Sequence, residues 1–131
     1  MKKILCIALL ILLGVGGYIA WNNAASRSKN RDTASVVVPK DAVIISMRQD
    51  EYVPSEITIK KGQTIVFKNE SNEWRWPASN LHPTHDIYPE FDPKEPVGTG
   101  KSWAFRFDKS GSWSMHDHLA PYITGTITVS P

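Results

Sequence analysis

All four histidines of this chain lie in two short clusters. His116 and His118 are separated by Asp117, and His82 and His85 stand three positions apart in a proline-containing segment. In an extended strand, alternate residues point to the same face about 6.5–7 Å apart, so His116 and His118 can converge on one ion while Asp117 points away. Imidazole is a common ligand of copper and zinc. The four histidines are therefore the candidate metal ligands.

The single cysteine narrows the possible chemistry. Cys6 lies inside the N-terminal apolar segment, so the chain can form no intrachain disulfide and offers no thiolate in its folded part. Any copper, zinc or iron site must use imidazole, carboxylate or main-chain oxygen. For such ligands the affinity order favours Cu(II) over Zn(II), so copper is the expected cofactor and zinc the less favoured one.

Two carboxylates stand beside the histidines. Asp86 follows His85, and Asp117 separates His116 from His118. A carboxylate near a ligating imidazole commonly accepts the other ring N–H and fixes its tautomer. Asp86 and Asp117 are therefore expected to support the metal ligands, the alternative being solvent-facing loop charges. No general base, nucleophile or substrate pocket is readable, so no catalytic residue is assigned and enzyme activity stays open.

The charge balance excludes one class of partner. Lys2 and Lys3 precede the first apolar run, and the rest of the chain carries 13 basic and 13 acidic side chains. Nucleic-acid binding requires clustered Lys and Arg. A neutral domain without a basic run indicates no nucleic-acid partner.

The N-terminal segment predicts attachment to a membrane. Residues 4–21 form a nearly unbroken apolar run, longer than the apolar region of about 7–15 residues in a signal peptide and close to the roughly 20 of a spanning helix. We expect residues 1–21 to be an uncleaved anchor that holds the domain outside the cytoplasm at the cell membrane. A cleaved signal giving a secreted or periplasmic domain is the alternative. The polar residues 22–40 are expected to be a flexible linker.

Residues 41–131 have the pattern of an all-β domain. Short segments of alternating or β-branched residues are separated by turn signals at regular spacing, which is typical of a sandwich or barrel. The expected strands are residues 42–48, 56–60, 64–69 and 101–107, one that runs through Trp113 and Met115, and a last one at 125–129. Residues 70–100 form a long segment rich in Pro, Asn, Asp and Trp, which predicts a packed functional loop that Tyr88 and Phe91 fix in place.

The domain resembles the cupredoxin-like family. The matching pieces run from Tyr52-Val-Pro54 to Asn69, from Phe105 to His116, and through the last segment Gly125-Thr-Ile-Thr-Val129. The resemblance implies a Greek-key β-sandwich of about seven or eight strands, with a metal held in loops at one end.

The same resemblance excludes a blue-copper centre. It places Asp117 at the position of the copper-binding cysteine, Ala120 at that of the second histidine and Ile123 at that of the methionine. The trigonal blue-copper site needs its thiolate. The segment Trp113-Ser-Met-His-Asp-His118 is instead similar to the His-x-His segment of multicopper oxidase domains, and Leu81-His-Pro-Thr-His85 to their paired-histidine loops. In those domains such pairs supply imidazoles to copper.

These observations predict an extracytoplasmic, membrane-anchored protein that binds copper through histidines in a non-blue site. Its expected role is copper handling or redox traffic, with a redox or copper-transfer protein as a possible partner. Two alternatives stay open: a small copper oxidoreductase acting on oxygen species, nitrogen oxides or phenols, and a metal-free β-sandwich interaction module.

Overall fold

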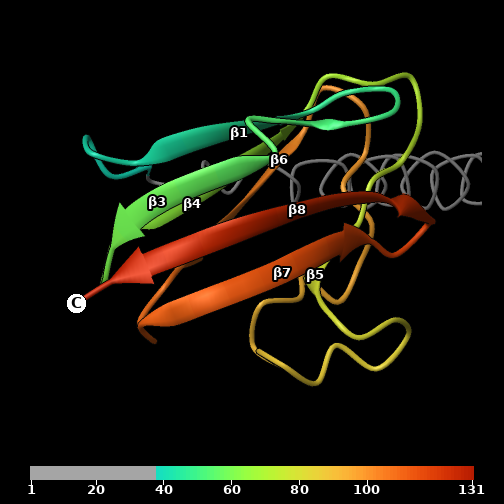
Figure 1. Ribbon diagram of the computed structural model, residues 1–131. Coiled ribbons are helices and arrows are strands. Elements are labelled where there is room, and N and C mark those ends of the chain that lie inside the picture. The colour runs from blue at the N-terminus through green and yellow to red at the C-terminus, as the bar shows by residue number, and fades with distance from the viewer. Residues whose placement is uncertain (1–37) are drawn as a thin grey trace, which may run out of the picture. The chain divides into compact units, whose positions relative to one another are not determined.

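The computed structural model describes residues 38–131, and the predicted anchor and almost all of the predicted linker lie outside this part. The described residues form eight strands and no helix (Figure 1). The strands are β1 (Val43–Met47), β2 (Tyr52–Val53), β3 (Glu56–Lys60), β4 (Thr64–Asn69), β5 (Pro77–Ser79), β6 (Ser102–Arg106), β7 (Gly111–Asp117) and β8 (Ala120–Ser130). Among residues 38–131, no helix is long and apolar enough to cross a membrane.

The strands form two four-stranded sheets packed face to face. One sheet has the order β2-β1-β4-β6 and the other β3-β8-β7-β5. Each sheet contains one parallel pair: β1 with β4 in the first sheet and β3 with β8 in the second. All other neighbouring strands are antiparallel. The predicted all-β sandwich is confirmed.

Alternating side chains build the core between the sheets. In β4, Ile65 and Phe67 are fully buried, and in β8, Ile127 and Val129 are buried from the opposite sheet. Period-two alternation places such residues on one face of a strand. The β-branched and alternating segments therefore became strands because each offered one continuous apolar face to the other sheet.

The long segment between β4 and β6 is packed, as the sequence predicted. Tyr88 and Phe91 are buried, and the Phe91 ring stacks on Trp103 with centroids 5.8 Å apart. Ring pairs at this separation contribute to stability beyond their buried area. These aromatic contacts fix the loop whose first half carries His82 and His85.

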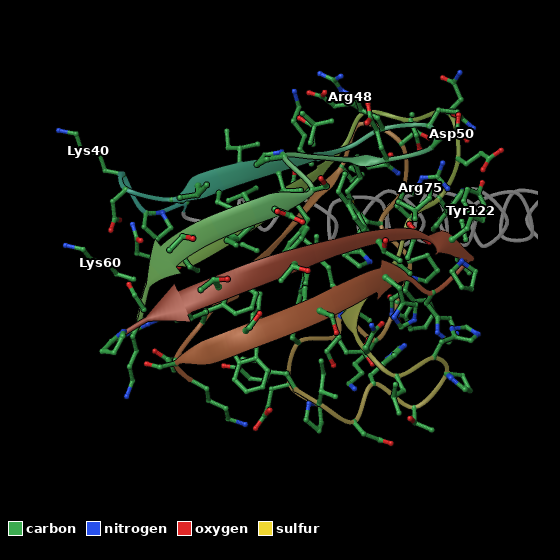
Figure 2. All side chains as sticks on the ribbon, in the orientation of Figure 1. Lys40, Arg48, Asp50, Lys60, Arg75 and Tyr122 are labelled. Atoms are coloured by element: carbon green, nitrogen blue, oxygen red, sulfur yellow. The ribbon has the colours of Figure 1, made fainter. Side chains whose placement is uncertain are left out.

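The sandwich has two distinct ends. At one end, which we call the β7–β8 pole, β7 stops at Asp117 and β8 begins at Ala120. At the other, the terminal pole, Lys61 donates its N–H to the Ser130 carbonyl and Gly62 donates to that of Phe107. The first residues of β1 lie at this terminal pole, since β1 is parallel to and in register with β4. Figure 2 labels Lys40 and Lys60 at the terminal pole and Arg75 and Tyr122 at the β7–β8 pole.

Candidate metal centre

The β7–β8 turn positions His116 and His118. The antiparallel ladder between these strands shifts register between His116 and Asp117. A bulge of this kind bends a strand and re-aims its side chains. The His118 N–H then donates to the Trp76 carbonyl at 2.8 Å, which fixes the turn against the segment that leads into β5.

The loop after β5 positions His82 and His85 beside them. β5 pairs with β7 so that Ala78 lies opposite His116, and the loop therefore starts next to the β7 histidine. The His85 carbonyl accepts a hydrogen bond from Ser79 Oγ at 2.8 Å. His85 has a φ of 58°, in the left-handed region that few non-glycine residues adopt and that recurs at functional sites.

The structure brings all four histidines together at the β7–β8 pole. His82 Nδ1 lies 3.2 Å from His116 Nε2, and His85 Nε2 lies 3.0 Å from His118 Nδ1. One ligand atom from each of His82, His116 and His118 falls within 4.8 Å of the others, and His85 is not part of this group. His116 and His85 are buried, His118 is half-buried and His82 is exposed, so the cluster opens to solvent on the His82 side.

Two outer hydrogen bonds set the tautomers of the buried pair. His116 Nδ1 lies 2.8 Å from Asn80 Oδ1, and the Asn80 amide nitrogen donates to Ser114 Oγ at 3.0 Å. His85 Nδ1 lies 2.8 Å from Asp92 Oδ2. An amide oxygen and a carboxylate accept only, so both Nδ1 atoms carry the proton. The Nε2 lone pairs of His85 and His116 therefore face the other two rings.

Each of the two histidine pairs has a spacing that fits a transition-metal ion. Two imidazole nitrogens bound to one ion at about 2.0–2.1 Å, and separated by angles of about 90–110°, lie roughly 2.9–3.4 Å apart. The two measured nitrogen–nitrogen distances of 3.2 and 3.0 Å fall within this range. A hydrogen bond from a protein group to the outer ring nitrogen is also the usual arrangement for a ligating histidine.

The electrostatics keep the buried ligand neutral. Burial, together with the neighbouring His85, His82 and His118, lowers the pKa of His116 to about 4. Burial, together with the neighbouring His85 and His82, lowers the pKa of His118. A metal binds only the deprotonated ring nitrogen. Both rings are therefore neutral, and ready to bind an ion, at neutral pH.

Asp92 and Asn80 support the ring nitrogens, and neither residue was predicted from the sequence. Burial raises the pKa of Asp92, but hydrogen bonds from Lys94 and His85 outweigh it and hold the pKa well below its usual value. Asp92 is therefore an ionised acceptor for His85. Its only signal in the sequence is its position directly after the buried Phe91, and spacing alone does not reveal which histidine it reaches.

Asp86 and Asp117 take other partners in the described part of the chain. Asp86 accepts a hydrogen bond from Thr84 Oγ1 at 2.6 Å. Asp117 is fully buried, and its oxygens accept backbone N–H groups from Trp76, Leu119 and Ala120. Asp117 thus supports the histidines through the backbone of the β7–β8 turn.

The position that the family resemblance assigns to a copper-binding cysteine does not fit a metal. Burial raises the pKa of Asp117 there, against the lowering effect of its backbone donors and of Arg75, whose Nε lies 4.0 Å from Oδ2. The neighbouring positions Ala120 and Ile123 are buried and apolar. A structural carboxylate and two apolar side chains occupy this place, and the imidazoles of the candidate centre form a separate donor set.

Trp76 covers one side of the centre. Its ring centroid lies 4.8 Å from that of His118, and its Nε1–H donates to Asp92 Oδ1 at 2.9 Å. The indole therefore packs on one ligand and fixes the carboxylate that supports another. Met115 is fully buried in the core, so its thioether belongs to the packing between the sheets.

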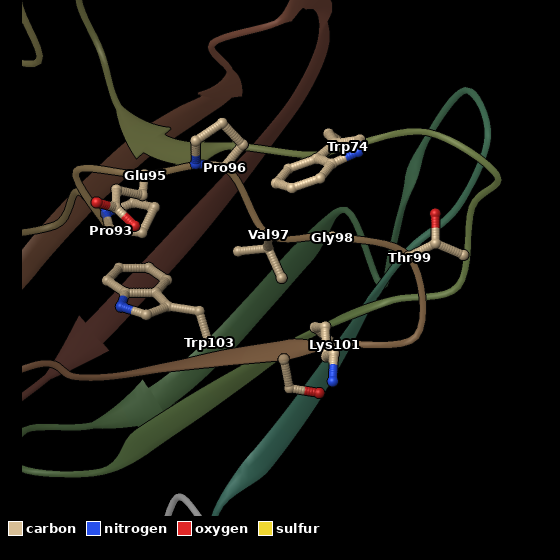
Figure 3. Close-up of a pocket in the computed structure, with 10 residues that line it drawn as sticks. Trp74, Pro93, Glu95, Pro96, Val97, Gly98, Thr99, Lys101 and Trp103 are labelled. Carbon is tan, nitrogen blue, oxygen red and sulfur yellow. The ribbon is translucent and has the colours of Figure 1, made fainter. Parts of the chain in front are cut away.

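A separate cavity lies beside β6 and contains none of the four histidines (Figure 3). Its volume is about 590 Å³, and Val97 forms part of its wall between Trp74 and Trp103. Trp74 is strongly exposed. The cavity is therefore a surface feature distinct from the metal centre.

Comparisons with known proteins agree with the fold and define the class. The sequence model of the cupredoxin-like domain family matches residues 9–129. The chain belongs to the cupredoxin-like domain family, and the predicted membership is confirmed.

Individual relatives are more distant. Amicyanin from Paracoccus versutus is 23% identical over 124 residues, which cover 94% of this chain and 92% of amicyanin. The crystal structure of amicyanin from the same organism superposes with a TM-score of 0.61 and 25% identity over 72% of this chain and 86% of that one. A purple cupredoxin from Nitrosopumilus maritimus shares the fold, with a TM-score of 0.59 and 21% identity over 67% of this chain and 99% of its own.

Proposed function

We propose that this protein binds copper through His82, His85, His116 and His118 and serves in copper handling or redox traffic. The observation that carries the proposal is the convergence of ligand atoms from His82, His116 and His118, with His85 beside His118. The tautomers of His85 and His116 are set by outer hydrogen bonds. Copper is the preferred ion because an all-imidazole donor set binds Cu(II) more tightly than Zn(II). A variant of amicyanin has been solved in its Cu(I) form, which supports copper as the metal associated with this fold.

In this proposal the metal ion is the bound cargo, and the chain's own residues bind and orient it. His85 and His116 are held by Asp92 and Asn80 with their lone pairs facing inward. His118 is fixed through its backbone, and the exposed His82 stands at the solvent side, where an ion or a partner protein gains access. A redox or copper-transfer protein is the expected partner.

We also propose that residues 1–21 anchor the domain outside the cytoplasm. Lys2 and Lys3 before a long apolar run are the supporting features. Fractionation of the native cells, with protease added from outside, tests this assignment. Recovery of the intact chain in the cytosolic fraction would refute it.

Metal analysis of the full chain in detergent tests the binding proposal. We expect one copper per chain and a pale Cu(II) spectrum without the intense charge-transfer band of a thiolate. Replacing both His116 and His118 with Ala should abolish stoichiometric uptake, because it removes two of the four donors.

The control changes two exposed side chains next to the ligands, Leu81 and Leu119, to Ala. This variant keeps every imidazole and should bind copper as the unmodified chain does. Unchanged uptake by the double histidine variant, with a native-like β-sheet spectrum, would refute the site.

A further inference from the structure

Two tryptophans line the cavity beside β6, one fixed by the core and one exposed. The Trp103 ring packs on those of Phe67 and Phe91, with centroids 5.6 and 5.8 Å apart. Trp74 is 62% exposed. Val97 lies between the two indoles in the wall of the cavity (Figure 3). A ligand that covers the exposed indole removes a large apolar surface from water, which favours binding.

Hydrogen bonds fix the backbone that carries the exposed indole. Arg75 donates its N–H to the Val97 carbonyl at 3.1 Å, and Val97 donates its own to the Arg75 carbonyl at 2.7 Å. The buried Asn69 donates from Nδ2 to the carbonyls of Glu73 and Val97, at 2.7 and 2.8 Å. Both neighbours of Trp74 are therefore tied to the sandwich. A cavity of about 590 Å³ whose walls are already in place is of the size and kind that binds small molecules, and little ordering opposes binding there.

The polar side chains around this cavity are free to bind a ligand. Those in its lining, all exposed, are Glu95, Thr99, Lys101 and Ser102. Within residues 38–131 none of these four side chains has a hydrogen-bond or ion-pair partner, whereas the neighbouring Lys94 pairs with Asp92 at 2.8 Å. The rim therefore combines a carboxylate, an ammonium group and two hydroxyls that are not used within the described part of the chain.

The chemistry of the rim indicates the class of ligand. A carboxylate accepts hydrogen bonds, an ammonium group donates them, and hydroxyls do both. One anion and one cation, Glu95 and Lys101, leave the lining without net charge, so a charged ligand gains no overall attraction. A matching ligand is neutral, has an apolar face for the indole, and carries groups at its edge that both donate and accept. A sugar ring has these properties, with C–H groups on its faces and hydroxyls around its edge.

We propose that this cavity binds a neutral saccharide, with Trp74 as the stacking surface and the four polar side chains of the rim as hydrogen-bond partners. A purely apolar ligand would use the indoles and Val97 but none of these polar groups. None of the four histidines lines the cavity. Saccharide binding is therefore a second property of the domain, and it does not depend on the proposed metal binding.

Titration calorimetry with three neutral oligosaccharides tests the proposal: cellohexaose, maltohexaose and N-acetylchitohexaose. The full chain is kept in a detergent without a sugar headgroup, and we expect at least one of the three to bind. Trp74→Ala should weaken that binding at least about tenfold, whereas Trp74→Phe should retain most of it because a flat apolar face remains. Since Trp74 is exposed, both variants should keep the β-sheet spectrum of the unmodified chain.

Tyr122→Ala is the matched control, because Tyr122 is an aromatic residue of β8 that is 71% exposed and does not line the cavity. It should bind the sugar as the unmodified chain does, and so should the variant with both His116 and His118 changed to Ala. Loss of sugar binding in that histidine variant, or equal losses in W74A and Y122A, would overturn the assignment to this cavity. No binding of any of the three sugars at millimolar concentration would also overturn it. Binding of decaproline without binding of a sugar would identify a peptide groove instead and refute the proposal.

Discussion

The substitution Asp92→Asn removes one charge and tests how His85 is held. Asp92 accepts four hydrogen bonds: Oδ1 from Trp76 Nε1 at 2.9 Å and from the Lys94 N–H at 2.8 Å, and Oδ2 from His85 Nδ1 and Lys94 Nζ, both at 2.8 Å. All four partners are donors. An asparagine has one acceptor oxygen and one donor nitrogen, so it cannot satisfy both sides.

Each orientation of the new amide has a cost. If its nitrogen faces His85, the imidazole must turn a lone pair on Nδ1 toward it, and the ring proton then moves to Nε2, the atom that faces the site. If its nitrogen faces Trp76 and Lys94 instead, donors meet donors. Loss of such an outer partner typically lowers metal affinity about 10- to 100-fold, which corresponds to roughly 1.4–2.7 kcal/mol.

The assay is competition for Cu(II) between the protein and a chelator of known affinity, with the full chain in detergent. Asp86→Asn is the control, because Asp86 is also beside the histidines but bonds to Thr84 and not to an imidazole. We expect D92N to bind copper at least about tenfold more weakly and D86N to bind within about twofold of the unmodified chain. Equal losses in the two variants, or full affinity in a well-folded D92N, would refute the role assigned to Asp92.

Two further predictions concern the stability of the metal-free domain. The pKa of His116 is about 4 in the folded state and 6.5 ordinarily, so the unfolded chain binds a proton at a higher pH than the folded chain does. The free energy of unfolding should therefore be largest above pH 6.5 and should fall by on the order of 3 kcal/mol as the pH drops to about 4. Urea titrations across this range measure the fall, and His116→Gln should flatten it; an equal slope in H116Q would contradict the assignment. Gly125→Ala should destabilise the domain by about 1–3 kcal/mol, since a Cβ there would lie 2.6 Å from Met115 Cε and 2.7 Å from the Ser55 carbonyl. Gly98→Ala, where the nearest atom is Lys101 Cγ at 3.8 Å, is the control for thermal unfolding, and equal melting temperatures of the two variants would show that Gly125 is not tightly packed.

The sandwich could be predicted because its strands carry their own pattern. In β3 the alternation of Ile57 and Ile59 with exposed residues reflects one buried face, which is a local property of the sequence. In β4, Ile65 and Phe67 share a face, although Val66 between them is buried too. The short β5 was missed, since Pro77, Ala78 and Ser79 are all buried and show no alternation. β2 was missed because two residues are too few to form a period.

The histidine pairs could also be predicted, since each pair is local in sequence. The two pairs come close in space because their loops lie at the same end of the fold, as the resemblance to cupredoxins implied. Asn80 and Asp92 could not be predicted in the same way. Each lies in residues 70–101, between β4 and β6, and reaches its imidazole through the path of that segment. No spacing rule predicts such a path.

The terminal pole has a practical and biological consequence. The described chain begins at Val38 and ends at Pro131, at the end of the sandwich away from the histidines, and the seven residues of β7 separate the two ends by about 20 Å. A tag or fusion partner added at either end of the domain therefore leaves the imidazole cluster uncovered. The same separation leaves the exposed His82 open to another macromolecule at the pole opposite both ends of the described chain.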